Sequence, residues 1–118
     1  MHKVENLKIW KKAIGLTKEV YTICKDLPSD EKFGLISQVK RSAVSIPSNI
    51  AEGAGRNSNK EFLHFLAIAN GSSYELQTQL ILLVELDLLK KQNIKEIIEK
   101  TIEIQKMNYA LQQSLKNS

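Results

Sequence analysis

The sequence has little cysteine, proline, glycine or aromatic content, and each shortage excludes a class of protein. Among 118 residues there are one cysteine, two prolines and five glycines, and 6% are aromatic. The single cysteine, Cys24, excludes an internal disulfide framework, and we expect it to be a small core residue. The few glycines and prolines argue against an all-β fold, which needs many turns. We therefore expect a helical protein with an aliphatic core.

Long apolar segments are also missing. The longest aliphatic run covers residues 80–84, far short of the ~20 residues that a membrane span needs. Residues 1–6 lack the apolar centre of a signal peptide. We expect a cytoplasmic protein.

Positive charge is concentrated in the first half of the sequence. Residues 1–60 carry eleven Lys/Arg against six Asp/Glu, whereas residues 61–118 carry six against seven. Such a basic half favours an acidic partner such as nucleic acid. Part of the charge is a solvated basic face on the first predicted helix, made of Lys8, Lys11, Lys12, Lys18 and Lys25.

Apolar periodicity and capping signals predict four helices, over about residues 6–27, 30–52, 59–89 and 94–115. Asn6, Ser29, Ser58 and Asn93 are the expected N-caps, with Glu61 completing a capping box, and Pro28 ends the first helix. Short loops between long helices predict one domain, 1–118, folded as an antiparallel up-down-up-down four-helix bundle.

Three of the helices show a stripe of residues at spacings of three and four, which predicts their buried faces. The stripes are Leu7, Trp10, Ile14, Thr17, Tyr21 and Cys24; then Leu35, Val39, Ala43, Ile46 and Ile50; and finally Ile94, Ile97, Thr101, Ile104, Asn108, Leu111 and Leu115.

The third predicted helix is unusually poor in charge. Between residues 62 and 84 only Glu75 is formally charged, although a surface helix of a monomer needs a charged face. Gly71 in its middle costs up to about 1 kcal/mol of helix propensity, which close approach of another helix would justify. This pattern predicts self-association.

The stretch from Lys40 to Arg56 holds the most distinctive residues. Pro47 removes an amide donor and predicts a kink, with nearby serine hydroxyls expected to satisfy the freed backbone groups. Gly53 is expected to end the helix in the left-handed conformation. Asn49 and Glu52 are predicted to tie the helix end to the next loop, with Glu52 pairing with Arg56; the alternative is a polar site at the bundle end.

Candidate catalytic and metal residues are few. His64 stands three residues after Glu61, but no matching Glu or His set completes a metal site, and no enzyme or cofactor motif is present. Candidate phosphate ligands are Lys11, Lys12, Lys40, Arg41, Arg56 and Lys60. Aromatic stacking platforms are not evident, so we expect contact with the backbone of a nucleic acid.

Several motifs resemble one bacterial family. They are Leu7-x-x-Trp10-Lys11-Lys12-Ala13, Phe33-Gly34-Leu35, Arg41-x-Ala43-Val44-Ser45-Ile46-Pro47-Ser48-Asn49-Ile50-Ala51-Glu52-Gly53, Gly55-Arg56, and Ser72-x-Tyr74-Glu75-Leu76. They resemble the four-helix bundle proteins encoded in intervening sequences of 23S rRNA genes, which are similar to the accessory variability determinant proteins of diversity-generating retroelements. The resemblance implies a homopentamer that binds nucleic acid.

The leading hypothesis is therefore a non-enzymatic, oligomeric bundle that binds RNA or DNA through phosphates. The alternative is a protein-protein interaction module or scaffold that does not bind nucleic acid directly. A third reading, a passenger of a mobile element with little cellular role, stays open.

Overall fold

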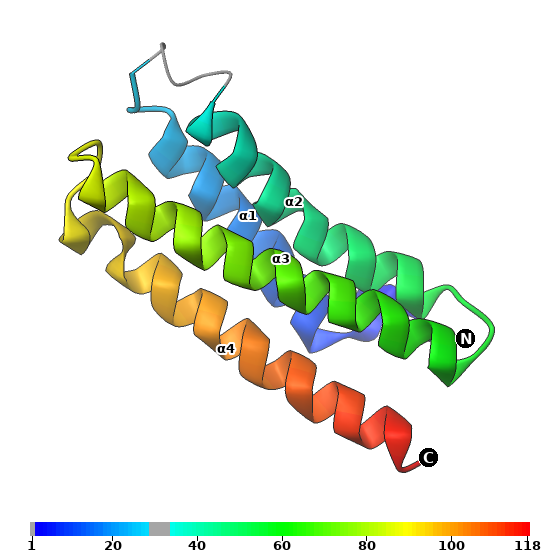
Figure 1. Ribbon diagram of the computed structural model, residues 1–118. Coiled ribbons are helices and arrows are strands. Elements are labelled where there is room, and N and C mark those ends of the chain that lie inside the picture. The colour runs from blue at the N-terminus through cyan, green and yellow to red at the C-terminus, as the bar shows by residue number, and fades with distance from the viewer. Residues whose placement is uncertain (1, 29–33) are drawn as a thin grey trace.

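Four helices lie side by side in the computed structural model, which describes residues 2–28 and 34–118 (Figure 1). A short 3-10 turn at Val4–Asn6 precedes α1 (Lys8–Cys24), α2 (Leu35–Ala54), α3 (Asn59–Glu85) and α4 (Lys91–Lys116). Helix α1 contacts α2 and α4, and α3 contacts the same two helices, so the four helices surround one core. The described chain is thus an all-α four-helix bundle, 46 × 23 × 20 Å in extent.

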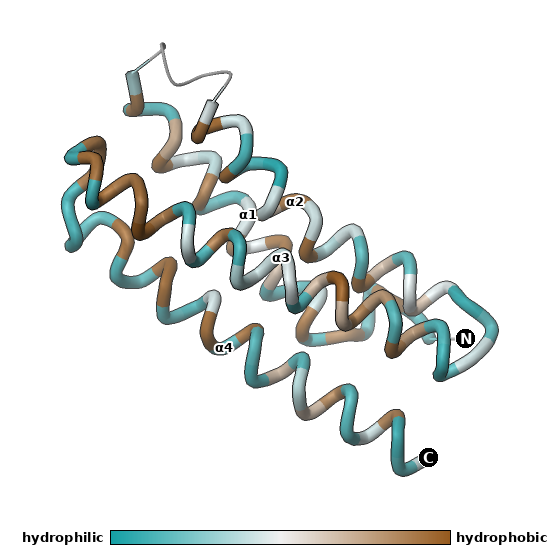
Figure 2. Tube along the Cα trace, viewed as in Figure 1, coloured by the Kyte–Doolittle hydropathy of each residue, from teal (hydrophilic) through white to brown (hydrophobic). Residues whose placement is uncertain are grey.

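The core is aliphatic, as expected, and every helix in Figure 2 carries brown, hydrophobic segments at intervals. Its largest fully buried side chains include Phe62, Leu16, Ile46 and Leu66. The stripes predicted for the second and fourth helices are confirmed except at Leu35 and Leu111, which are half-buried. No helix of the described residues combines the length and apolarity needed to span a membrane.

The predicted buried stripe of the first helix is wrong except at Cys24, and Leu7, Trp10 and Thr17 are only half-buried. The buried face consists of Ile9, Ala13, Leu16, Val20 and Cys24, whereas Ile14 and Tyr21 are 37% and 41% exposed. Two apolar stripes lie one residue apart on this helix, and the predicted one began at Leu7, which stands just before the helix. The smaller Ala13 and Val20 face the core, and the larger Ile14 and Tyr21 lie at its edge.

The ends of the first two helices also differ from the prediction. Asn6 belongs to the 3-10 turn, and Leu7 occupies the N-cap of α1 without a side-chain cap. The predicted cap at Ser29 lies outside the described residues, and α2 begins at Leu35, directly after Gly34. At its other end α2 continues through Gly53 to Ala54.

The connection between α3 and α4 is longer than predicted. Helix α3 ends at Glu85 because the next residues form a turn, in which the amides of Leu88 and Leu89 both donate to the Leu83 carbonyl. Helix α4 begins at Lys91, and Asn93 is not its N-cap: its side chain accepts from the Lys90 amide at 2.9 Å. The predicted cap at the start of α3 is present, since the Ser58 hydroxyl accepts from the Glu61 amide at 3.2 Å.

Pro47 lies inside a continuous helix, and its freed carbonyl partner is satisfied from another helix. Proline removes the bond to the carbonyl four residues earlier, here Ala43. The Thr17 hydroxyl of α1 lies 3.1 Å from that oxygen and 2.8 Å from the Ala13 carbonyl, so its single proton is shared between them. The expectation that nearby serines of α2 do this is therefore wrong. Thr17 couples the proline to the α1–α2 contact.

Gly53 is required for close packing and not for a left-handed conformation. It is buried and helical, and a Cβ atom there would lie 2.8 Å from the Phe65 Cβ and 2.9 Å from the Phe62 ring. The backbone of α2 therefore approaches the phenylalanines of α3 at a distance that no other residue permits without rearrangement. The C-cap of α2 is Gly55, which has ordinary right-handed backbone angles.

Candidate nucleic-acid interface

The side of the bundle formed by α1 and α2 exposes both apolar and basic side chains. Ile14 and Tyr21 of α1 and Val44 of α2 are each about two fifths exposed. The Lys40 ammonium lies 5.0 Å from the centroid of the Tyr21 ring, which places the two side chains on one surface. The contact is a cation–π interaction of modest strength, because the ring is open to solvent.

Two lysines of α1 and the lysine at its C-cap follow the same edge. Lys11, Lys18 and Lys25 stand seven residues apart, so they drift by only about 20° per interval around the helix. Lys18 and Lys25 are the surface neighbours of Tyr21 at three and four residues. With Lys40 and Arg41 of α2 they form what we call the α1/α2 basic face.

The cations of this face are free of carboxylate partners in the described part of the chain. Within the described ranges, none of its five cations makes an ion pair with a carboxylate. The cations that do form ion pairs there are Lys12, Arg56 and Lys100: Lys12 bonds to Glu103, and Lys100 donates to Glu19 at 2.8 Å, which links α1 to α4. The hydrogen bond to Glu19 raises the pKa of Lys100 above its ordinary value. Among the residues described, the charge of the five cations on this face is therefore not offset by a carboxylate contact.

Arg56 has a different environment from Arg41, although both were predicted as phosphate ligands. Its guanidinium lies 3.3 Å from Glu52 and 3.9 Å from Glu61, and it stacks over the Phe65 ring at 4.8 Å. The predicted pairing of Glu52 with Arg56 is confirmed. Two carboxylates offset this charge, so Arg56 attracts an anion less than Arg41 does.

The structure separates the six predicted ligands into groups. Lys11, Lys40 and Arg41 belong to the α1/α2 basic face, and Lys12 faces α4 through Glu103. Arg56 and Lys60 lie beyond the end of α2, where fourteen residues at 1.5 Å per residue place Gly55 about 20 Å from Arg41. The predicted patch is thus two distant sites. Lys18 and Lys25, which the sequence placed on the solvated basic face of the first helix, lie at a seven-residue spacing from Lys11 and so on the same side of the helix.

Asn49 holds α2 and does not form a joint site with Glu52. Its amide donates to the carbonyl and the hydroxyl of Ser45 at 2.8 and 2.9 Å, and the Ser45 hydroxyl lies 2.8 Å from that of Ser72 on α3. This chain of bonds joins α2 to α3 beside Pro47. Glu52 is exposed on the loop side, so the alternative of a shared polar site finds no support in these contacts.

Metal-binding and nucleophilic groups are not assembled in the described part of the chain. No three His, Cys, Asp or Glu side chains gather there. His64 is exposed and makes an edge contact with the Phe65 ring. Cys24 is buried, and desolvation raises the pKa of its thiol, with Lys40 acting weakly in the opposite direction. A thiol of this kind is inert at neutral pH.

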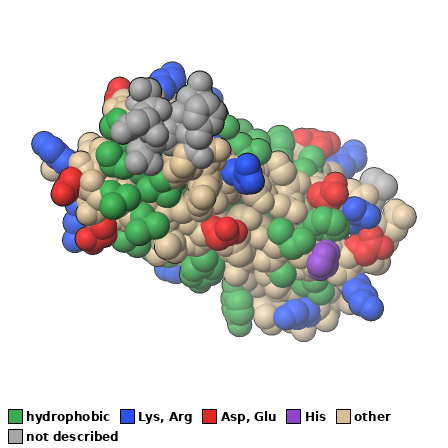
Figure 3. Space-filling model, turned by 45° about the horizontal axis from the view of Figure 1, so that its top comes forward, with side chains coloured by type: hydrophobic (Ala, Val, Ile, Leu, Met, Phe, Trp, Pro, Cys, Tyr) green, Lys and Arg blue, Asp and Glu red, His purple; other side chains and the backbone are tan. Residues whose placement is uncertain are grey.

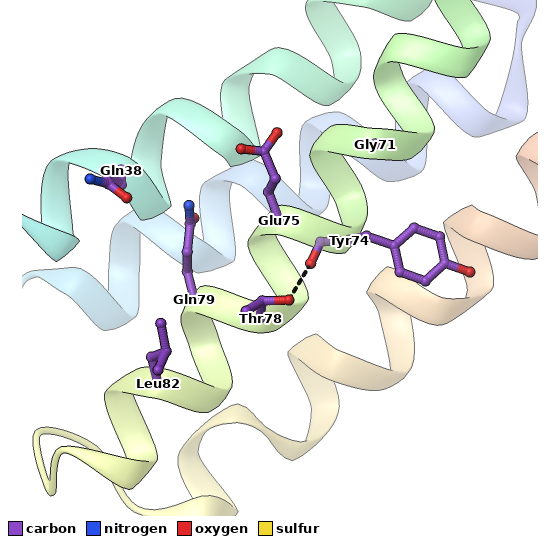
Figure 4. Close-up of a pocket in the computed structure, with 7 residues that line it drawn as sticks. All are labelled: Gln38, Gly71, Tyr74, Glu75, Thr78, Gln79 and Leu82. Atoms are coloured by element: carbon purple, nitrogen blue, oxygen red, sulfur yellow. Dashed lines mark hydrogen bonds between the residues drawn. The ribbon is translucent and has the colours of Figure 1, made fainter.

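A second exposed region is the groove between α2 and α3, which we call the α2/α3 groove (Figure 4). It has a volume of about 400 Å³ and is lined by Gln38, Gly71, Tyr74, Glu75, Thr78, Gln79 and Leu82. Gln79 is 9% exposed, and its Oε1 has no hydrogen-bond partner among the described residues. A Cβ atom on Gly71 would meet nothing within 4 Å, so no helix of this chain approaches it. In Figure 3 hydrophobic side chains lie across one face of the bundle between few charged ones.

Comparison with known proteins places this architecture in a family. Residues 5–110 match the family described as 23S rRNA-intervening sequence protein. A solved structure of a protein with unknown function from the S23 ribosomal protein family of Bacteroides thetaiotaomicron VPI-5482 is similar, with a TM-score of 0.82 and 25% identity. The match covers 88% of this chain and 97% of that one. Proteins with curated descriptions show no match. Because the match extends over nearly all of the bundle, the chain belongs to the 23S rRNA-intervening sequence protein family.

Proposed function

We propose that this protein is a non-enzymatic, cytoplasmic nucleic-acid-binding protein that contacts RNA or DNA through backbone phosphates. The observation that carries the proposal is the α1/α2 basic face, whose five cations have no carboxylate partner among the residues that the structure describes. Cations that no carboxylate offsets attract an approaching anion. Membership of a family named for rRNA-intervening sequences is in keeping with such a ligand.

The spacing of this face suits a polyanion. Lys11, Lys18 and Lys25 rise about 10.5 Å apart along α1 at 1.5 Å per residue. Lysine ammonium groups on flexible stems act as point charges, and Arg41 adds a guanidinium fork that can bind a phosphate in bidentate fashion. Contacts of this kind fix position and carry no base preference.

Self-association would combine the weak nucleic-acid affinity of each subunit into a higher affinity of the assembly. We propose that the up-down-up-down bundle assembles through the α2/α3 groove into a homo-oligomer, which the family resemblance makes a pentamer. The orphan oxygen of Gln79 supports this assembly, because an unmet buried acceptor costs about 1–3 kcal/mol and a second subunit could supply the donor. Several basic faces on one particle would raise the avidity for a long strand.

The alternative function is a protein-interaction module, and the same groove favours it. A partner helix could occupy the space beside Gly71 and Leu82. A pull-down whose captured protein survives nuclease treatment would support this alternative over nucleic-acid binding.

Salt titration tests the proposed function. Binding of a labelled mixed-sequence RNA duplex should weaken steeply with salt, with a slope of log K against log salt of up to about −4.5 for five phosphate contacts. Arg41→Gln should reduce this slope by about 1, whereas Arg56→Gln, the matched control with a paired guanidinium, should change it less. Binding that is absent, or that ignores salt, would refute the proposal.

A further inference from the structure

Two of the three tyrosines stand exposed beside one hollow between α3 and α4. Tyr74 is 54% exposed and Tyr109 is 67% exposed, and both line a hollow of about 400 Å³ together with Ile102, Gln105 and Lys106. Figure 4 shows the Tyr74 ring pointing away from the α2/α3 groove and toward α4. The packing of α3 against α4 thus pairs two aromatic side chains that lie far apart in the sequence.

We call this site the tyrosine hollow. Its walls combine the rings of Tyr74 and Tyr109 with the side-chain amide of Gln105. The Gln105 amide donates to the Gln77 oxygen of α3 at 2.9 Å, which holds its orientation. This bond leaves the Gln105 oxygen free to accept and its second N–H free to donate. Neither tyrosine hydroxyl makes a hydrogen bond to the described residues, and the lining residues include a lysine and no carboxylate.

We propose that the tyrosine hollow binds an unpaired nucleobase of a single-stranded nucleic acid. Aromatic rings offer a stacking surface to any base, and an amide with a free donor and acceptor matches the edge of a base. Lys106 stands beside them as a contact for the neighbouring phosphate. The inference rests on the proposed function and sharpens it, because it names unpaired nucleotides as the preferred ligand.

Duplexes are excluded from this site by their own stacking. A paired base is covered on both faces, so it reaches a protein pocket only after it has been unstacked and unpaired. The α1/α2 basic face, in contrast, meets phosphates of either form. The two regions involve different pairs of helices and can therefore be tested separately.

Nuclear magnetic resonance of tyrosine-labelled protein tests the tyrosine hollow without any long nucleic acid. The probes are adenosine 5′-monophosphate and ribose 5-phosphate, the same anion without a base, at millimolar concentrations. The ring signals of Tyr74 and Tyr109 should shift with the nucleotide and not with the sugar phosphate, whereas Tyr21, which lies beside Lys40 on the α1/α2 basic face, should respond equally to both phosphates. No shift of the Tyr74 and Tyr109 signals, or equal shifts of them with both probes, would overturn the inference.

Oligonucleotide binding gives the second test. The variant Tyr74→Leu/Tyr109→Leu should bind a single-stranded RNA about tenfold more weakly than wild type does. It should bind a duplex of the same length with the wild-type affinity. Tyr74→Phe/Tyr109→Phe keeps the rings and should keep the affinity. Unchanged single-strand affinity in the leucine variant, or equal losses for both RNAs, would overturn the inference, as would a changed solution mass, which would assign the tyrosines to a subunit contact.

The two proposals can fail independently. Nucleotide-dependent tyrosine shifts together with salt-insensitive RNA binding would refute the α1/α2 basic face and leave the base site standing. If binding to duplex and single strand depends equally on salt and the tyrosine signals do not shift, the base site is refuted and the α1/α2 basic face stands. Thermal unfolding followed by circular dichroism checks that the exposed substitutions leave the fold intact.

Discussion

Helix α2 borders two surfaces of opposite character. On its α1 side Lys40 lies over the Tyr21 ring, beside other half-exposed apolar groups, and the exposed Arg41 follows Lys40 in the sequence. On its α3 side lies the α2/α3 groove, whose one charged lining residue is Glu75. Among the described residues, the cations of the first surface lack carboxylate partners, and the second surface leaves the Gln79 oxygen without a hydrogen-bond partner. One helix therefore borders a surface that we propose binds anions and another that we propose binds a protein.

The largest expected effect is the loss of the proposed oligomer when a charge is introduced into the α2/α3 groove. We expect Leu82→Glu, at a side chain 43% exposed, to convert the proposed oligomer to single subunits, because an ionised carboxylate in a subunit contact lacks a partner. Light scattering coupled to size exclusion gives the mass. Ser114→Glu on α4 adds the same charge at an exposed position and should leave the mass unchanged. A wild-type monomer, or an unaltered mass in Leu82→Glu, would contradict the assignment of the groove.

Replacing lysines tests whether cations without ion pairs contribute more to RNA affinity than a lysine that forms one. The triple variant Lys11→Gln/Lys18→Gln/Lys25→Gln should lose on the order of 100-fold in RNA affinity at 0.1 M salt and reduce the salt slope by about 3. Lys12→Gln, on the same helix but paired with Glu103, should lose much less than any one of the three. Fluorescence anisotropy measures both quantities. Equal losses for Lys12→Gln and Lys18→Gln would show that ion pairing does not select the binding face.

Two glycines of the α2–α3 pair have opposite surroundings: Gly53 is closely packed against α3, and Gly71 has open space beside it. Gly53→Ala should destabilise the protein by about 1–3 kcal/mol, because its Cβ would meet Phe65 and Phe62. Gly71→Ala should stabilise an isolated subunit by about 0.5–1 kcal/mol, since the site is open and alanine favours the helix. Urea unfolding of both variants measures the free energy of unfolding. A destabilising Gly71→Ala would show that the groove closes over this position.

The smallest expected effect is a change in the pH dependence of stability on replacing Cys24, which is buried in the core behind the α1/α2 basic face. Burial raises the pKa of its thiol above the ordinary value of 9.0, so the unfolded chain ionises first and stability falls as pH rises above about 9. The loss continues until the pH passes the pKa of the folded state, and below pH 9 the contribution is fully present. Cys24→Ala should lower stability at pH 7 through its cavity and flatten this alkaline decline. An identical decline in wild type and variant would exclude the thiol as its cause.

Much of the fold could be predicted from local signals. The stripes around Val39 and Ala43 in α2 and around Ile97 and Thr101 in α4 lie where expected, because each helix carries one dominant apolar face. In α1 two stripes compete, and periodicity alone does not decide whether Ile14 or Ala13 is buried. Helix ends were less predictable: apolar residues such as Leu88 and Leu89 continue the pattern beyond α3 while their backbone forms a turn.

The candidate site could be predicted only in part. Lys40, Arg41 and Lys11 were identified by charge, but charge in the sequence does not reveal that Glu103 neutralises Lys12 or that Glu52 and Glu61 surround Arg56. Stacking platforms were not expected because aromatic residues are sparse. Tyr74 and Tyr109 nevertheless share one hollow, since the register of two packed helices brings them together.

Four helices, an aliphatic core, a basic first half and a charge-poor third helix follow from composition and from residue spacing within single helices. Only the tertiary structure decided which charges stay unpaired, why Gly53 must lack a side chain, and how Thr17 satisfies the carbonyl that Pro47 frees. The physical reason is distance along the chain. Periodicity acts within a few residues, whereas ion pairs, close backbone approaches and shared hollows depend on how separate helices meet.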